Sequence, residues 1–223
     1  TMANSSWQVS QDTASRSLST HKVLRNTYMM LAMTLLFSAL TAGVAMSMGV
    51  GRMNIFVLLI GAYGLMFLVH KTANSTAGIF ATFAFTGFMG FTLGPVLNAY
   101  LSLPNGGQLV MTALGMTGIT FAGLSAVALV TRKDFSFLGN FLFAGAIVLI
   151  LAMLAAMIFN ISGLALAVSA GFVLFASAAI LFETSQIIHG GQTNYLLATV
   201  SLYVSIYNMF VSLLALLGFA SDD

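Results

Sequence analysis

Residues 35–48 read LLFSALTAGVAMSM, an apolar run of several helical turns without a charged side chain. A strand of a transmembrane β-barrel alternates apolar and polar residues over about ten positions, and this run does not alternate. A spanning helix instead needs about 20 predominantly apolar residues to cross the hydrocarbon core. The stretch therefore predicts a membrane-spanning helix over residues 28–48.

The run at 35–48 belongs to the first of seven such segments. The others lie at residues 55–70, 77–103, 109–130, 135–159, 161–188 and 195–219. Connections of a few residues make sequential helices antiparallel neighbours and leave no room for a second domain. We therefore expect an all-α polytopic membrane protein whose seven transmembrane helices form one compact bundle over residues 27–220.

The composition supports the same class of protein. Apolar residues make up 59% of the 223 residues and charged residues only 5%, against roughly 25% charged residues in a soluble domain. So few charged side chains cannot cover the water-exposed surface of a soluble enzyme. A net charge of +2 cannot form a basic surface for nucleic acid. The absence of cysteine excludes disulfides, thiolate metal sites and a thiol nucleophile.

Residues 1–26 differ from the rest of the chain. They are rich in Ser, Thr, Gln and Asn and contain Asp12, Arg16, Lys22 and Arg25. We interpret them as a flexible cytoplasmic tail, because a segment with so few apolar residues is not expected to fold alone. A cleaved signal peptide is the alternative, but its basic and apolar parts would lie closer to the start.

Lysine and arginine are distributed asymmetrically between the two sides of the predicted bundle. The tail and the connections after the second, fourth and sixth spans contain Arg16, Lys22, Arg25, Lys71, Arg132 and Lys133. The opposite side contains only Arg52. Because basic residues favour the cytoplasmic side, we expect a cytoplasmic N-terminus and an external C-terminus at Ser221–Asp223.

Small residues recur at helical spacing in three of the predicted spans. These residues are Gly61 and Gly64, then Gly87, Gly90 and Gly94, and then Gly115 and Gly118. Because lipid gives helices no hydrophobic reason to associate, such glycines favour close helix packing. A hinge or a pore-lining role is the alternative.

Pro95 directly follows Gly94 inside the third span. Proline lacks a backbone N–H and clashes with the preceding turn of a helix. We therefore expect the third helix to kink or break at Gly94–Pro95, with the freed carbonyl finding a partner or a wet cavity.

Glu183, in the sixth span, is the single acidic residue within any apolar run. A charged side chain at the centre of the bilayer costs at least about 2.5 kcal/mol, so such residues are usually functional. We therefore regard Glu183 as the first candidate for an ion pathway or a pH sensor. The alternative is a solvated position near the cytoplasmic interface, because the predicted turn at Gly190 follows shortly after it.

The seventh span carries a polar face that could complete this site. Ser201, Ser205, Asn208 and Ser212 are spaced four, three and four residues apart, which places them on one stripe of a helix. Because a short hairpin joins the sixth and seventh spans, Ser205 can lie at the depth of Glu183. The stripe is equally consistent with hydrogen bonds between helices and with a hydrated path.

Basic side chains occur near the cytoplasmic ends of the predicted helices. Those that could pair with Glu183 and hold it ionised are His70, Lys71, Arg132 and His189. His189 precedes Gly190 and so falls in a predicted turn, where a solvated ring and a pH-sensing ring both fit the sequence.

Signatures of catalysis are absent from the sequence. It contains no HExxH, GxSxG or phosphate-binding-loop motif, and no second carboxylate accompanies Glu183 in the apolar runs. Three scattered histidines do not form a metal site. We expect neither an enzyme nor a resident metal or cofactor.

Three motifs together resemble the Bax inhibitor-1 family. They are TGFMGFTLGPVL at residues 86–97, FETSQIIHGG at 182–191 and SLYVSIYNMFVSLLALLGF at 201–219. The resemblance extends over about residues 19–219 and is most detailed for a branch found in the bacterial inner membrane. It implies that localisation, and a fold in which one central helix is surrounded by the others.

The family resemblance implies two functions. The inner-membrane branch of the family modulates FtsH, a membrane-anchored AAA protease. The resemblance therefore suggests that this chain binds such a protease and that residues 2–26 are the point of engagement. Some other bacterial members of the family that this chain resembles are pH-sensitive calcium leaks, with an aspartate pair on helices six and seven. That likeness suggests passage of calcium or protons around Glu183.

The sequence departs from that aspartate pair at both positions. Glu183 stands at the helix-six position and Ser205 at the helix-seven position. A single carboxylate has no second acid with which to share a proton, and calcium prefers several charged oxygens. We therefore favour protease binding and keep a calcium or other cation leak as the alternative.

Overall fold

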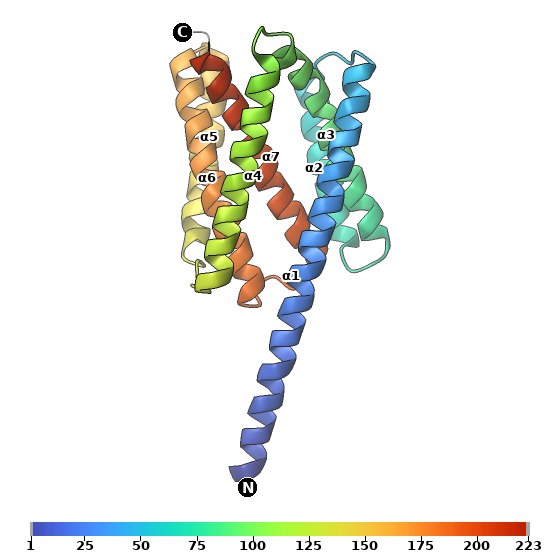
Figure 1. Cartoon of the computed structure of the whole chain (residues 1–223), viewed down its shortest axis with the longest axis vertical. Coiled ribbons are helices and arrows are strands. Elements are labelled where there is room, and N and C mark those ends of the chain that lie inside the picture. The colour runs from blue at the N-terminus through green and yellow to red at the C-terminus, as the bar shows by residue number, and fades with distance from the viewer. Residues whose placement is uncertain (1, 222–223) are drawn as a thin grey trace.

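The computed structural model describes residues 2–221, with side chains from Trp7 onward, as seven α-helices (Figure 1). Their bounds are α1 Met2–Ser47, α2 Ile55–Thr72, α3 Ala77–Leu101, α4 Gly106–Thr131, α5 Leu138–Phe159, α6 Ser162–Ile188 and α7 Tyr195–Ala220. Each helix is long and apolar enough to cross a membrane. Residues 2–221 contain no strand, so the predicted all-α membrane bundle is confirmed.

Polar residues at the helix ends determine where several spans begin and stop. The Asn194 side chain accepts hydrogen bonds from the backbone N–H groups of Leu196 and Leu197, which caps the start of α7. Asn54 caps α2 in the same way. Arg132 and Asn160, in the left-handed conformation, end α4 and α5.

The first helix, α1, begins at Met2, whereas the apolar pattern predicted a span starting at residue 28. The extra helix projects beyond the bundle (Figure 1), and at 1.5 Å per residue the segment 2–26 reaches roughly 37 Å. Propagation from the spanning part avoids the cost of nucleating a new helix. The hydroxyls of Thr13 and Ser15 donate to carbonyls of the same helix. The flexibility and the cytoplasmic position of this segment stay predictions.

The seventh helix, α7, is the centre of the bundle. It contacts α1, α2, α3, α4 and α6, and it is the most deeply buried of the seven described spans. Leu202, Met209 and Leu214 are fully buried in the core that surrounds it. Among the described helices, α5 packs against α6 alone. The central helix implied by the family resemblance is therefore present, and it is the helix that carries the polar stripe.

Glycines allow α3 to approach α1 closely. A Cβ atom at Gly87 would lie 2.5 Å from the ring of Phe37, and one at Gly90 would overlap the backbone of Ser38. A larger residue at Gly90 would move α1 away from α3, whereas one at Gly87 would displace the Phe37 ring. The predicted packing role of these two glycines is therefore confirmed.

The third helix does not end at Gly94–Pro95, since α3 continues through Pro95 to Leu101; the expected kink there stays a prediction. Gly94 packs directly against Ala45 of α1. A neighbouring helix thus supports both halves of α3 across the proline, as is common in membrane bundles.

Three other glycines do not pack as predicted. A Cβ atom added at Gly64, Gly115 or Gly118 would meet no other atom within 4 Å. These glycines leave open space at the helix surface instead of bringing two helices together.

The connections between helices alternate between the two ends of the bundle. The projecting part of α1 and the α2–α3, α4–α5 and α6–α7 connections share the lower end in Figure 1. This end gathers the six basic residues on which the predicted orientation depends. The end of α7 lies at the opposite side, and Asp222 and Asp223 lie outside the described residues.

Candidate functional site

Glu183 of α6 and Ser205 of α7 are in direct contact. The Ser205 Oγ atom lies 3.2 Å from the Glu183 Oε2 atom and 3.1 Å from the backbone carbonyl oxygen of Ser201. Ser205 is buried and Glu183 is partly buried. The hairpin between α6 and α7 therefore brings the acid and the hydroxyl to the same depth, as their sequence positions suggested.

The hydroxyl of Ser205 has one proton and two acceptors within reach. An ionised Glu183 accepts this proton. A neutral Glu183 can instead donate to the Ser205 oxygen, while Ser205 donates to the Ser201 carbonyl. Both protonation states of the carboxyl group therefore find a hydrogen bond without a change of backbone.

The four basic residues considered as partners of Glu183 lie elsewhere. His70 Nδ1 is 2.8 Å from the Met66 carbonyl oxygen of its own helix. His189 Nε2 is 3.1 Å from the Arg132 carbonyl oxygen. Lys71 and the Arg132 side chain are exposed at helix ends. His70 and Lys71 lie in the last turn of α2, whereas Arg132 and His189 directly follow the ends of α4 and α6. Among the described residues, Ser205 is the one side chain that hydrogen-bonds Glu183.

His189 belongs to a polar cluster that ties the α4–α5 connection to the end of α6. The backbone N–H of Phe135 donates to Ser185 Oγ at 2.9 Å, and Gln186 Nε2 donates to Ser136 Oγ at 3.3 Å. Asp134, in the same connection, accepts hydrogen bonds from Ser136. These bonds lower the pKa of the Asp134 carboxyl below its ordinary value.

The sequence offered only weak signals for this cluster. Asp134 and Ser136 have the spacing of a turn in which a side chain bonds the backbone two residues on. Ser185 and His189 are one helical turn apart, so they share a face of α6. Neither signal indicates that the end of α6 contacts the α4–α5 connection, which lies about 50 residues earlier in the chain.

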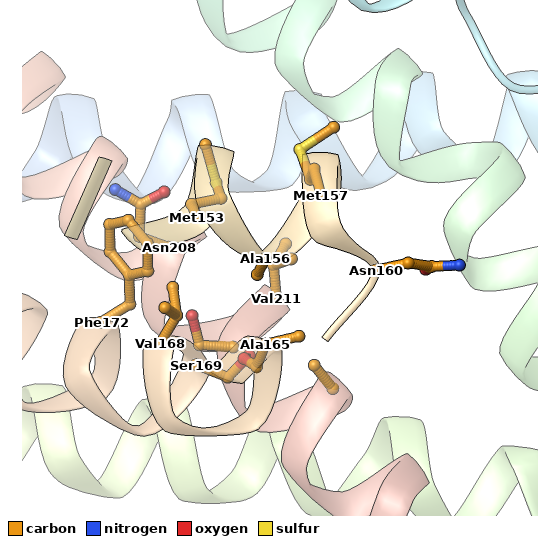
Figure 2. A pocket seen from close by; sticks show the side chains of 12 residues that line it. Met153, Ala156, Met157, Asn160, Ala165, Val168, Ser169, Phe172, Asn208 and Val211 are labelled. Carbon is orange, nitrogen blue, oxygen red and sulfur yellow. The ribbon is translucent and has the colours of Figure 1, made fainter. Parts of the chain in front are cut away.

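A cavity of about 450 Å³ lies between α5, α6 and α7 (Figure 2). Its polar lining residues are Asn160, Ser169, Asn208 and Ser212. The rest of the wall is apolar, including Met153, Val168 and Phe172. Figure 2 shows Asn208 and Ser169 among the side chains around this space. Amide and hydroxyl groups at membrane depth need hydrogen-bond partners, so this wall is suited to hold water.

The polar stripe of α7 thus serves two places. Ser205 reaches Glu183, and Ser201 supplies the carbonyl group beside it. Asn208 and Ser212 line the cavity farther along α7. Ser169 was missed from the sequence, although it lies about four helical turns before Glu183 on the same face of α6.

Two tyrosines of α7 form a separate hydroxyl network on another side of the helix. Tyr203 OH lies 2.6 Å from Ser38 Oγ of α1, and Tyr207 OH lies 3.1 Å from Thr92 Oγ1 of α3. Tyr203 precedes Ser205 by two positions, which is roughly 200° around a helix. The tyrosines therefore join α7 to α1 and α3 rather than to Glu183.

Comparisons with known proteins give consistent results. The model of the family described as inhibitor of apoptosis-promoting Bax1 matches residues 20–222. An uncharacterised protein of Pseudomonas aeruginosa is 59% identical over 90% of this chain and 90% of its own length. A protein of Escherichia coli strain K12, named modulator of FtsH protease YccA, is 56% identical over 92% of this chain and 94% of its own length. An uncharacterised membrane protein of Vibrio cholerae is 46% identical over 93% of this chain and 94% of its own length.

Proposed function

Because this chain belongs to the family described as inhibitor of apoptosis-promoting Bax1, we propose that it binds and modulates an FtsH-type membrane protease without being an enzyme itself. The observation that carries the proposal is the similarity to the Escherichia coli protein named for that role. The two chains are 56% identical over 206 residues. A second relative, also 56% identical to this chain, is named an inner membrane protein, and we propose the same membrane for this chain.

The projecting segment of α1 supports this proposal. Residues 2–26 extend away from the bundle (Figure 1), and Trp7 and Leu18 are 69% and 70% exposed. Most of the stability of a helix in a protein comes from tertiary packing, which the exposed part of this segment lacks. A protease that pulls on an unfolded end could therefore unwind this segment without disturbing the seven packed helices.

The proposed orientation places the projecting segment on the cytoplasmic side. The basic residues of the chain are concentrated at that end of the bundle, and basic residues favour the cytoplasmic face of a membrane. A hexameric AAA protease with its catalytic part in the cytoplasm would then meet residues 2–26 first.

Affinity purification from native membranes tests the proposal. The full chain and a variant lacking residues 2–20 would each be captured through a tag, and the retained FtsH-type protease quantified. We expect the full chain to retain the protease and the truncated chain to retain less. Absence of the protease from both samples, in several mild detergents, would contradict the proposal.

A second candidate function is a pH-sensitive leak for protons or another cation around Glu183. The Glu183–Ser205 contact and the polar cavity that Asn208 and Ser212 line favour it. Within the described residues, no three His, Asp or Glu side chains gather as metal ligands. Calcium prefers several charged oxygens, so a proton suits a single carboxyl group better than calcium does.

A further inference from the structure

A second cavity, of about 440 Å³, lies between α1, α3, α4 and α7. It is separate from the polar cavity beside α5 and α6. Its wall is almost entirely apolar and includes Leu93 and Leu97 of α3 and Ile206 and Phe210 of α7. Cavities of this volume and character are typical of sites for apolar ligands.

The cavity opens between α1 and α4. In Figure 1 these helices stand on either side of α7. Both pack against α7, and the rings of Tyr28 and Phe121, with centroids 6.1 Å apart, are a contact between α1 and α4 themselves. The lining residues on α3 and α7 are buried or half-buried, whereas Gly43 of α1 and Gly118 of α4 are exposed. A Cβ atom added at either glycine would meet nothing within 4 Å. The two glycines therefore form an open rim.

The medium outside this rim is the hydrocarbon core of the bilayer. Both helices are membrane spans, and the neighbouring residues Leu40 and Ile119 are 68% and 76% exposed. Exposed apolar side chains at this density belong to a lipid-facing surface. A molecule that enters between α1 and α4 therefore comes from among the acyl chains.

The polar atoms around this cavity already have partners. Tyr203 OH is paired with Ser38, and Tyr207 OH is paired with Thr92. Thr117 Oγ1 donates to the Ala113 carbonyl at 2.7 Å. An apolar cavity whose polar groups are satisfied does not retain water. Without a ligand the cavity would therefore stay empty, and its lining side chains would lack packing contacts on that side.

We propose that this cavity holds an acyl chain of a membrane phospholipid, which enters laterally between Gly43 and Gly118. A transmembrane helix of a partner is too thick for the same space. One turn of a helix, roughly 10 Å wide and 5.4 Å tall, occupies on the order of 400 Å³ and would fill the cavity by itself. A slender, flexible chain can enter lengthwise and contact the apolar wall.

Quenching of tryptophan fluorescence by brominated lipid tests the proposal. The chain contains one tryptophan, Trp7, so Trp7→Phe gives a silent background. Phe210→Trp then places a probe at the cavity wall, where Phe210 is 7% exposed. In vesicles of phosphatidylcholine brominated in the middle of its acyl chains, this probe should be strongly quenched relative to vesicles of the unbrominated lipid.

Substitutions at the rim give the matched controls. Gly118→Leu should remove most of the quenching, and Gly43→Leu on the opposite rim should do the same. Gly115→Leu should leave quenching unchanged, because Gly115 is also exposed with open space around it but does not line the cavity. If Phe210→Trp fails to fold, Phe121→Trp probes the same wall from α4, with Gly43→Leu as its rim variant.

Three outcomes would overturn the proposal. In the first, the probe is not quenched in brominated vesicles. In the second, the probe is quenched equally in the Gly115→Leu and Gly118→Leu variants. In the third, only brominated free fatty acid added to unbrominated vesicles quenches the probe, which would assign the cavity to a free acid. Melting of each variant in detergent establishes that the fold is retained.

Discussion

Ser205 Oγ lies 3.2 Å from Glu183 Oε2, so a hydroxyl group of the central helix meets the one glutamate of the chain. The pair joins α6 to α7 at a position where one of the two groups can carry charge. Because either protonation state of Glu183 can be hydrogen-bonded, the contact can stabilise the bundle and also serve a proton-dependent function. Stability and flux measurements separate these roles.

Ser205→Ala should lower the free energy of unfolding by about 1–3 kcal/mol, because it removes the hydroxyl partner of a partly buried carboxyl group. Ser205→Thr keeps the hydroxyl and should recover most of the loss. Ser169→Ala is the matched control, since its hydroxyl bonds only within its own helix, and should change stability by less than about 0.5 kcal/mol. Thermal melting in one detergent checks all three. Equal melting of the Ser205→Ala variant and the wild-type chain would mean that the contact contributes nothing to stability.

Glu183→Gln keeps a hydrogen-bonding side chain but removes the titrating group. If the protein conducts protons or another cation, flux through the variant should lose its pH dependence between about pH 5 and pH 8. Flux into liposomes across a pH series measures this, with empty liposomes as the blank. Wild-type flux no higher than the blank at every pH would rule out the leak. An unchanged pH profile in the variant would move the sensor to His70 or His189.

Gly90→Ala should destabilise the bundle by about 1–3 kcal/mol, because the added Cβ overlaps the backbone of Ser38 and pushes α1 from α3. Gly115→Ala adds the same methyl group where space is open and should be neutral or stabilising by up to about 1 kcal/mol. Detergent melting compares the two. Similar effects at both positions would show that helix propensity, rather than the α1–α3 contact, decides the outcome.

Deleting residues 2–20 should slow degradation of this protein by the protease while the bundle stays folded. The reason is that the protease loses the segment that it can unwind first. Pulse-chase measurement of turnover in cells checks the rate, and melting of the purified variant checks the fold. Ala14→Pro is a useful control, because it breaks only the projecting helix and should not slow turnover. Unchanged turnover after the deletion would mean that the protease engages the chain elsewhere.

The sequence predicted most of the helices because apolar runs of spanning length have few other uses in a chain with so little charge. It missed the start of α1, since helix propagation through the polar residues 2–26 leaves no apolar pattern. It identified Glu183 and Ser205 because they lie in helices joined by a short hairpin. The cavity between α1 and α4 could not be predicted, because it depends on how helices distant in the sequence pack around α7.

A reconstituted degradation assay tests most directly whether this protein modulates an FtsH-type protease. The purified protease and a different membrane substrate would share one bilayer, and the rate of substrate loss would be followed as the intact chain is added. We expect the rate to fall as the chain is added, and the variant lacking residues 2–20 to be less effective. A degradation rate that stays constant up to a large excess of the intact chain would show that the chain does not modulate the protease.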